Sequence, residues 1–194
     1  MEAVQDRGSP EEAQRRGAGE IVLIDPLVCD LSPLVALFQS DSLAVLHAAQ
    51  QDLDVLAHAV KAVPKRLYDT QLAAGFLGYS TPSLVSLLQS ELKVTAAKGD
   101  RLTDWLRRPL TADQCEYAAA DVAHLLQLHD RLTKQLAELG RTSWADDACD
   151  DLLRKPVSVA LADYYRLRIQ ISLAALVLVD HWLRQRAQNA PLGF

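Results

Sequence analysis

Cysteine is scarce in this sequence: there are three, Cys29, Cys115 and Cys149, among 194 residues. They lie far apart, and no two of them have a metal-site spacing such as C-x-x-C. A zinc site built from cysteine pairs is therefore not expected. We expect three reduced thiols, mostly buried, in a protein of a reducing compartment.

Glycine-rich and histidine-rich motifs are missing as well. No phosphate loop of the P-loop or dinucleotide type occurs, and no two of the five histidines have the H-x₃-H spacing of a metal site. For His47 and His124, which lie near the motifs described below, surface or core roles are the first interpretation.

The sequence contains no long uninterrupted hydrophobic run. Its most apolar stretch, Ile169 to Leu183, is interrupted by Asp180 and His181 and is too short to span a bilayer. The residues after Met1 are polar and acidic, so no signal peptide is expected. These absences predict a soluble cytoplasmic protein without a membrane partner.

Positive charge is not in excess: the formal net charge is −5, and 23% of the residues are charged. Such a surface repels polyanions on average, so any nucleic-acid contact must come from a local basic patch. One candidate is the irregular stretch between Lys93 and Pro109, where Lys98, Arg101, Arg107 and Arg108 could bind substrate phosphates. The alternative is an ordinary solvated loop.

Apolar residues, at 49% of the chain, are enough for one domain with a core and a small second module. Residues 1–20 are polar and are expected to be a disordered lead-in. Ile21–Ile24 and Leu43–Leu46 are apolar runs that predict short buried strands. Few strands among many helices predict a helix-rich α/β fold, with a small sheet covered by helices.

Helices are recognised by their capping residues and apolar stripes. They are predicted after Ser32, from about Gln50, after Asp69 and after Ser83. The longest one is predicted to begin at the capping box Thr111-x-x-Gln114 and to run through Leu139 to Gly140.

After this helix the sequence turns acidic. Asp146 to Asp151 is predicted to be a linker between modules, and Val157 to Arg186 one or two further helices. The predicted division is therefore a lead-in at 1–20, a main domain at 21–151 and a C-terminal helical part at 152–194.

Two carboxylates are candidates for chemistry. Asp121 shares one helix face with Gln114 and Tyr117, which are seven and four residues earlier. This face predicts either a tyrosine–aspartate hydrogen bond or a metal-ligating carboxylate beside a tyrosine that orients water. Asp52 lies in the first turn of its helix, where position alone favours an acid that interacts with the helix dipole.

Four strings of this sequence occur together in one family. His47-Ala-Ala-Gln-Gln-Asp52-Leu resembles the second exonuclease motif of ribonuclease D, and Leu67-Tyr-Asp-Thr-Gln-Leu-Ala-Ala74 resembles the segment after it. The stretch from Asp104 to Val122, with its Tyr117-x-x-x-Asp121 core, is similar to the third motif. Ile24-Asp-Pro-Leu27 resembles a strand that leads into the domain.

The resemblance implies a ribonuclease H-like fold of the DEDD 3′-5′ exonucleases, in the branch that contains a tyrosine. It implies two divalent metal ions, Mg²⁺ or Mn²⁺, and substrates that are single-stranded RNA 3′ ends, such as those of tRNA precursors. Asp121 would be a direct metal ligand, Asp52 would help to bind the second metal, and Tyr117 would orient the attacking water. Gln114 is expected near the substrate.

The sequence departs from this family pattern at both ends. No Asp-x-Glu, the family's first motif, occurs before Ile21, so two of four carboxylates are expected to be missing. The family's first strands are also expected to be missing, which predicts an exposed sheet edge and self-association. Trp182 and the last residues resemble the start of an HRDC domain, which helps members of the ribonuclease D family to bind RNA. The alternative function is a catalytically inactive RNA-binding or scaffold fragment.

Overall fold

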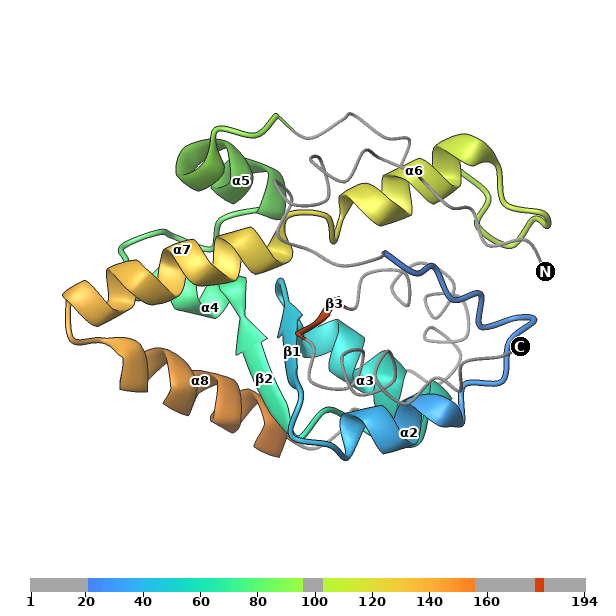
Figure 1. Cartoon of the computed structure of the whole chain (residues 1–194), viewed down its shortest axis with the longest axis horizontal. Helices are drawn as coiled ribbons and strands as arrows, with labels where there is room; N and C mark the ends of the chain where they lie inside the picture. The colour runs from blue at the N-terminus through green and yellow to red at the C-terminus, as the bar shows by residue number, and fades with distance from the viewer. Residues whose placement is uncertain (1–20, 96–102, 156–176, 180–194) are drawn as a thin grey trace, which may run out of the picture.

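The computed structural model of the chain describes residues 21–95, 103–155 and 177–179 (Figure 1). In this part the sheet has three strands in the order β2-β1-β3. β1 (Leu43–Leu46) pairs in parallel with β2 (Arg66–Asp69), so that Leu46 lies opposite Asp69. β3 (Val177–Val179) pairs antiparallel to β1.

Seven helices surround this sheet within the described residues. Their bounds are α2 (Pro33–Phe38), α3 (Gln50–Ala59), α4 (Thr70–Gly75), α5 (Leu84–Leu92), α6 (Ala112–Ala120), α7 (Leu125–Glu138) and α8 (Thr142–Arg154). None of the helices in this part of the chain is both long and apolar enough to cross a membrane. The helix-rich α/β architecture predicted from the sequence is confirmed.

Several helices begin at the residues that the sequence predicted. The Asp69 carboxylate accepts from the first amides of α4, and the Ser83 hydroxyl accepts from Ser86 N in α5. Thr111 and Gln114 form both bonds of the predicted capping box at the start of α6. Side-chain oxygens thus satisfy backbone amides that have no partner inside the helix.

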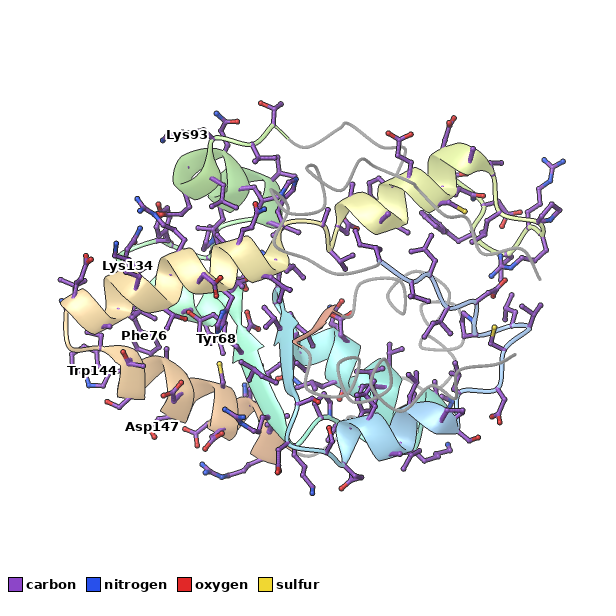
Figure 2. The ribbon with its side chains drawn as sticks, in the orientation of Figure 1. Tyr68, Phe76, Lys93, Lys134, Trp144 and Asp147 are labelled. Atoms are coloured by element: carbon purple, nitrogen blue, oxygen red, sulfur yellow. The ribbon has the colours of Figure 1, made fainter. Side chains whose placement is uncertain are left out.

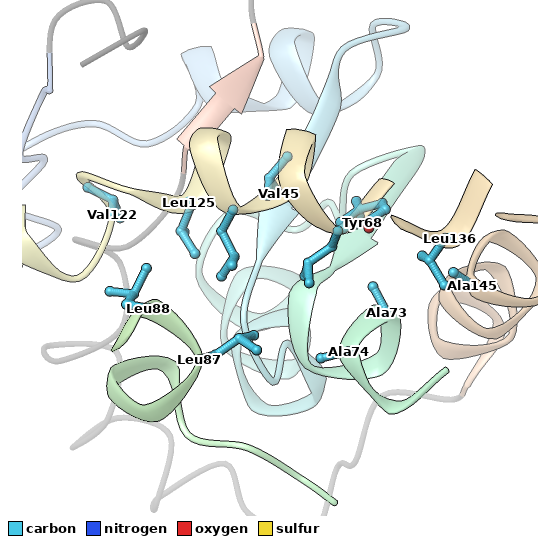
Figure 3. Packing of buried hydrophobic residues seen from close by; sticks show 12 residues of the cluster. Val45, Tyr68, Ala73, Ala74, Leu87, Leu88, Val122, Leu125, Leu136 and Ala145 are labelled. Carbon is cyan, nitrogen blue, oxygen red and sulfur yellow. The ribbon is translucent and has the colours of Figure 1, made fainter. Parts of the chain in front are cut away.

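The first hydrophobic cluster lies between the sheet and α4, α5 and α7 (Figure 3). Val45 of β1 and Tyr68 of β2 face it, together with Leu128 and Leu132 of α7. Tyr68 packs edge-on against the ring of His129, with 4.6 Å between ring centroids. Its burial raises the pKa of Tyr68 to about 12, so this phenol stays neutral and serves the core.

The second cluster covers the opposite face of the same strands. Ala44 and Leu46 alternate with Val45 along β1, as the period of two in a strand requires. They pack with residues of α3 and α8, including Leu53 and Cys149. β1 is therefore buried on both faces, which explains why its four residues are all apolar.

The turn between α7 and α8 has an aromatic corner (Figure 2). Trp144 is 54% exposed and lies edge-on to Phe76, with 6.2 Å between ring centroids. Arg141 donates a 2.8 Å hydrogen bond to Phe76 O, and its guanidinium carbon lies 5.6 Å from the Trp144 ring centroid. This corner fastens the start of α8 to the end of α4.

The single long helix predicted from Thr111 to Leu139 is wrong. Residues 121–124 form turns between α6 and α7, so Asp121 is the C-cap of α6 and not a residue inside a helix. Leu139, predicted to continue the apolar side, is 54% exposed. The predicted end at Gly140 is confirmed, with a left-handed φ of +66° that glycine adopts without strain.

The acidic linker predicted at Asp146–Asp151 is also wrong. These residues belong to α8, whose buried side is formed by Ala145, Cys149 and Leu152. Three apolar residues at this spacing make one helix stripe, and the aspartates occupy the solvated face. The boundary predicted after residue 151 lies inside α8, which continues to Arg154, and the division into domains remains a prediction.

Two further predictions about strands need correction. Ile21–Ile24 does not form a strand, although it is apolar. Val177–Val179, predicted to be helical, forms β3 and pairs with β1. β1 therefore has a strand on each side, whereas the predicted exposed sheet edge, for which no strand was named, stays a prediction. Residues 1–20 and the rest of the predicted C-terminal helices and HRDC-like segment lie outside the described residues.

Candidate functional site

Asp52 lies in the first turn of α3, which follows the carboxyl end of β1 (Figure 1). Its side chain is half-buried, whereas the next residue, Leu53, is buried in the second cluster with Leu46. The connection from strand to helix is short and tight: Ala48 has a left-handed φ of +57°, which is unusual for a residue with a side chain.

Asp69, a residue that the sequence predicted only as a helix cap, holds this connection in place. Its Oδ1 accepts from Ala48 N at 3.0 Å, and its Oδ2 accepts from Ala49 N at 2.8 Å. The same Oδ1 accepts from Gln71 N at 2.8 Å and from Leu72 N at 3.3 Å. One carboxylate, 2% exposed, therefore joins the start of α3 to the start of α4.

His47 is part of the same connection. Its Nε2 lies 3.1 Å from Pro82 O and therefore carries a proton, because a carbonyl oxygen only accepts. Its Nδ1 lies 2.9 Å from the Thr70 hydroxyl, which is 3.0 Å from Leu46 O. Burial lowers the pKa of His47, against the opposing effect of the nearby Asp69 carboxylate. The His47 ring therefore has a structural role: it links the end of β1 to Thr70 and Pro82.

Asp121 and Tyr117 lie at the end of α6. The Asp121 amide donates to Tyr117 O at 3.2 Å, and both side chains are half-buried. The carbonyl end of a helix carries partial negative charge, which disfavours a carboxylate and favours a cation beside it. Val122, the residue after Asp121, is buried in the first cluster, to which Val45 of β1 also belongs.

The loop before α6 supports Tyr117. The buried ring of Trp105 lies 6.0 Å from the Tyr117 ring, centroid to centroid. Arg108 donates to Trp105 O at 2.7 Å and forms an ion pair with Asp25. Gln114, which is 5% exposed, donates to Asp104 O at 3.1 Å. These bonds fix the loop against α6.

Among the described residues, no contact joins the basic residues that were predicted to bind substrate into one patch. Arg108 and Gln114 are engaged in the loop, and Arg107 is exposed. Lys98 and Arg101 lie outside the described residues. Their role at a substrate entrance remains a prediction.

Asp52 and Asp121 each precede a buried residue, and these two buried residues belong to the clusters on opposite faces of β1. Leu53, which follows Asp52, belongs to the second cluster together with Leu46. Val122, which follows Asp121, belongs to the first cluster together with Val45. Carboxylate oxygens are the donors that Mg²⁺ and Mn²⁺ prefer. However, in residues 21–95 and 103–155 no group of three or more His, Cys, Asp or Glu side chains could hold a metal ion. The carboxylates of Asp52 and Asp121 are therefore the type of ligand that a hard divalent ion prefers, but they are only two.

Comparison with known sequences supports this arrangement of motifs. Residues 11–137, more than half of the chain, match the 3′-5′ exonuclease family. Ribonuclease D of Zymomonas mobilis is 35% identical over 181 residues, which cover 88% of this chain and 46% of that protein. Ribonuclease D of Escherichia coli is 36% identical over 187 residues, covering 89% of this chain and 49% of that protein. The chain thus spans about half the length of these relatives.

Comparison with solved structures gives the same fold. The crystal structure of Escherichia coli RNase D, described as an exoribonuclease involved in structured RNA processing, has a TM-score of 0.62 and 36% identity, covering 71% of this chain and 38% of that one. Brucella melitensis NrnC with bound Mg²⁺ has a TM-score of 0.51 and 31% identity, covering 55% of this chain and 53% of that one. On these grounds, this chain belongs to the 3′-5′ exonuclease family and is similar to ribonuclease D.

Proposed function

We propose that this chain acts as a metal-dependent 3′-5′ exoribonuclease of the ribonuclease D type. The observation that carries the proposal is the match to this family over residues 11–137, in which the residues that follow Asp52 and Asp121 belong to the clusters on the two faces of β1. The relative from Brucella melitensis was solved with bound Mg²⁺ and in another structure bound to pGG. These precedents support a divalent ion and a nucleic-acid 3′ end as the ligands.

Asp52, Asp121 and Tyr117 each have a role in the proposed reaction. Asp52 and Asp121 would hold Mg²⁺ or Mn²⁺ through their carboxylate oxygens. Such ions, when bound, activate water and stabilise charge on the phosphate. The Tyr117 hydroxyl would orient the attacking water, and the packing of its ring against Trp105 limits its movement. Water adds to phosphorus and loses a proton, the bond from phosphorus to the 3′ oxygen of the preceding nucleotide breaks, that oxygen takes up a proton, and a nucleoside 5′-monophosphate leaves.

The natural substrate belongs to the same proposal. We assign single-stranded RNA 3′ ends, including those of tRNA precursors, and action in the cytoplasm, by the resemblance to ribonuclease D. Because the net charge is −5, substrate affinity must depend on local cations and bound metal more than on the overall field. Arg107, which is exposed, and Lys98 and Arg101 are the candidate phosphate contacts.

The experiment is digestion of a 5′-labelled single-stranded RNA by the purified chain with Mg²⁺ or Mn²⁺. We expect a ladder that shortens from the 3′ end, and its loss in Asp121→Asn. Asp113→Asn is the matched control, since Asp113 is an exposed acid in the first turn of the same helix. No shortening by a protein whose folding is verified by circular dichroism would refute the proposed activity.

One observation favours a second function, an RNA-binding or scaffold protein without catalysis. Two carboxylates are a weak ligand set for Mg²⁺, which gives up its waters reluctantly, and the described residues contain no larger group. This alternative predicts that a labelled RNA shifts in a binding assay but stays intact. Self-association through a sheet edge has less support, because β3 pairs with β1 and α8 lies along β2.

A further inference from the structure

We propose that Asp69 is a positioning residue for Asp52: its buried carboxylate fixes the first turn of α3 and thereby the direction of the metal-binding side chain. This inference rests on the proposed function, since it assigns a role within the same site. It adds to that function a residue outside the Asp52, Tyr117 and Asp121 set.

α3 has no side-chain hydrogen bond from its own N-cap residue. Its N-cap residue is Ala49, whose side chain has no oxygen to accept a hydrogen bond. The amides of Ala48 and Ala49, just before the first helical residue, are bonded to Asp69, which lies 21 and 20 residues further along the chain. The orientation of the first turn of α3 therefore depends on a residue at the end of β2.

The Asp69 carboxylate is itself held in a fixed position. Asp69 is 2% exposed and makes four hydrogen bonds to backbone amides, so its carboxylate has no freedom to follow a moving helix. The left-handed backbone of Ala48 is maintained by the same bonds. Asp52 lies only three residues after Ala49, within the turn that these bonds orient. Groups that orient metal ligands contribute to metal affinity although they do not touch the metal.

The structure suggests a selective substitution. In Asp69→Asn the amide oxygen can replace Oδ1, which keeps the bonds to Ala48, Gln71 and Leu72. The new NH₂ group then faces the Ala49 amide, so that one donor opposes another. Asparagine remains a good N-cap for α4. The substitution should thus disturb the start of α3 and leave α4 capped.

The test combines amide hydrogen exchange with Mn²⁺ titration followed by electron paramagnetic resonance, on the whole chain. In Asp69→Asn we expect faster exchange at residues 49–53 with little change at Gln71 and Leu72. We also expect Mn²⁺ affinity to fall about tenfold, and the Asp52→Asn/Asp69→Asn double variant to bind no more weakly than Asp52→Asn alone. Non-additivity of this kind shows that two residues act through one another.

The matched control is Val55→Ala, which removes methyl groups from a side chain of α3 that is 1% exposed, without touching the Asp69 bonds. If Asp69→Asn binds Mn²⁺ no more weakly than Val55→Ala, the positioning role is refuted while the proposed metal site stands. If Asp52→Asn binds Mn²⁺ as tightly as the unmodified chain, the metal site itself is refuted, and the positioning role with it. The Asp52 variant alone separates the two failures.

Discussion

Asp25 and Arg108, which are 83 residues apart in the sequence, form a bidentate ion pair. Arg108 Nη2 donates to Asp25 Oδ1 at 2.8 Å, and Arg108 Nε donates to Asp25 Oδ2. The same guanidinium donates to the carbonyl of Trp105, whose ring packs against Tyr117. The segment before α2 is therefore fastened to the loop that supports the candidate site.

Asp25→Asn is expected to destabilise the fold. Both partners are largely buried, with 19% of the Asp25 side chain and 23% of the Arg108 side chain exposed, so the pair is poorly replaced by water. We expect a loss of about 2 kcal/mol in the free energy of unfolding by urea. Asp150→Asn is the control: it breaks an exposed pair with Arg154 and should cost less than about 1 kcal/mol. Equal losses in the two variants would contradict a structural role for the Asp25 pair.

The contribution of Asp25 to the free energy of unfolding should also depend on pH. The hydrogen bonds from Arg108, opposed by burial, lower the pKa of Asp25 below its ordinary value of 3.8. A carboxyl group with a lowered pKa stabilises the folded state above the unfolded value, and this stabilisation is lost as pH falls through the folded value. The difference between the unmodified chain and Asp25→Asn should therefore be complete at about pH 6 and shrink below about pH 4. Urea unfolding across this range measures it, and a difference that grows in acid would disprove the assignment.

Cys149 should be chemically inert in the folded protein. Burial raises the pKa of its thiol to about 11, and its sulfur accepts a 3.2 Å hydrogen bond from Asp69 N. Because the thiolate is the reactive form, iodoacetamide at about pH 8 should modify Cys149 only after unfolding. Cys29 and Cys115 are half-buried and serve as internal references. Mass spectrometry of tryptic peptides gives the extent of alkylation at each cysteine. Modification of Cys149 in the folded protein as fast as that of Cys29 and Cys115 would contradict its burial.

The capping box at the start of α6 should be worth a measurable amount of stability. Thr111 Oγ1 accepts from Gln114 N at 3.2 Å, and Gln114 Oε1 accepts from Thr111 N at 2.9 Å. Thr111→Ala should lower the free energy of unfolding by about 1 kcal/mol. Thr111→Ser keeps the hydroxyl and should recover most of it. If serine and alanine are equally unstable, the loss comes from packing and not from the cap.

Local signals made much of the fold predictable. The starts of α4, α5 and α6 follow from Asp69, Ser83 and Thr111, whose side chains cap within three residues. The break between α6 and α7 was missed because it contains no glycine or proline. The helix α8 was not predicted because aspartates dominate the composition of this stretch, although the sequence contains the apolar stripe of Ala145, Cys149 and Leu152.

Long-range contacts account for the remaining misses. Ile21–Ile24 has the composition of a strand, but the segment is fixed by Asp25, whose partner Arg108 no local pattern reveals. Asp69 was recognised as a cap, yet its bonds to Ala48 and Ala49 depend on how β1 and β2 pair. The residues that carry the candidate site could be chosen from motif resemblance. The groups that orient them required the tertiary structure.

The most direct measurement of the central claim, that Asp52 and Asp121 form one metal site, is paramagnetic line broadening by Mn²⁺ in the NMR spectrum of the chain. We expect substoichiometric Mn²⁺ to broaden the amide signals of residues 50–53 and 117–122 together, and Asp121→Asn to abolish both effects. Broadening of only one of these segments, or of the exposed aspartates of α8 instead, would contradict a shared site.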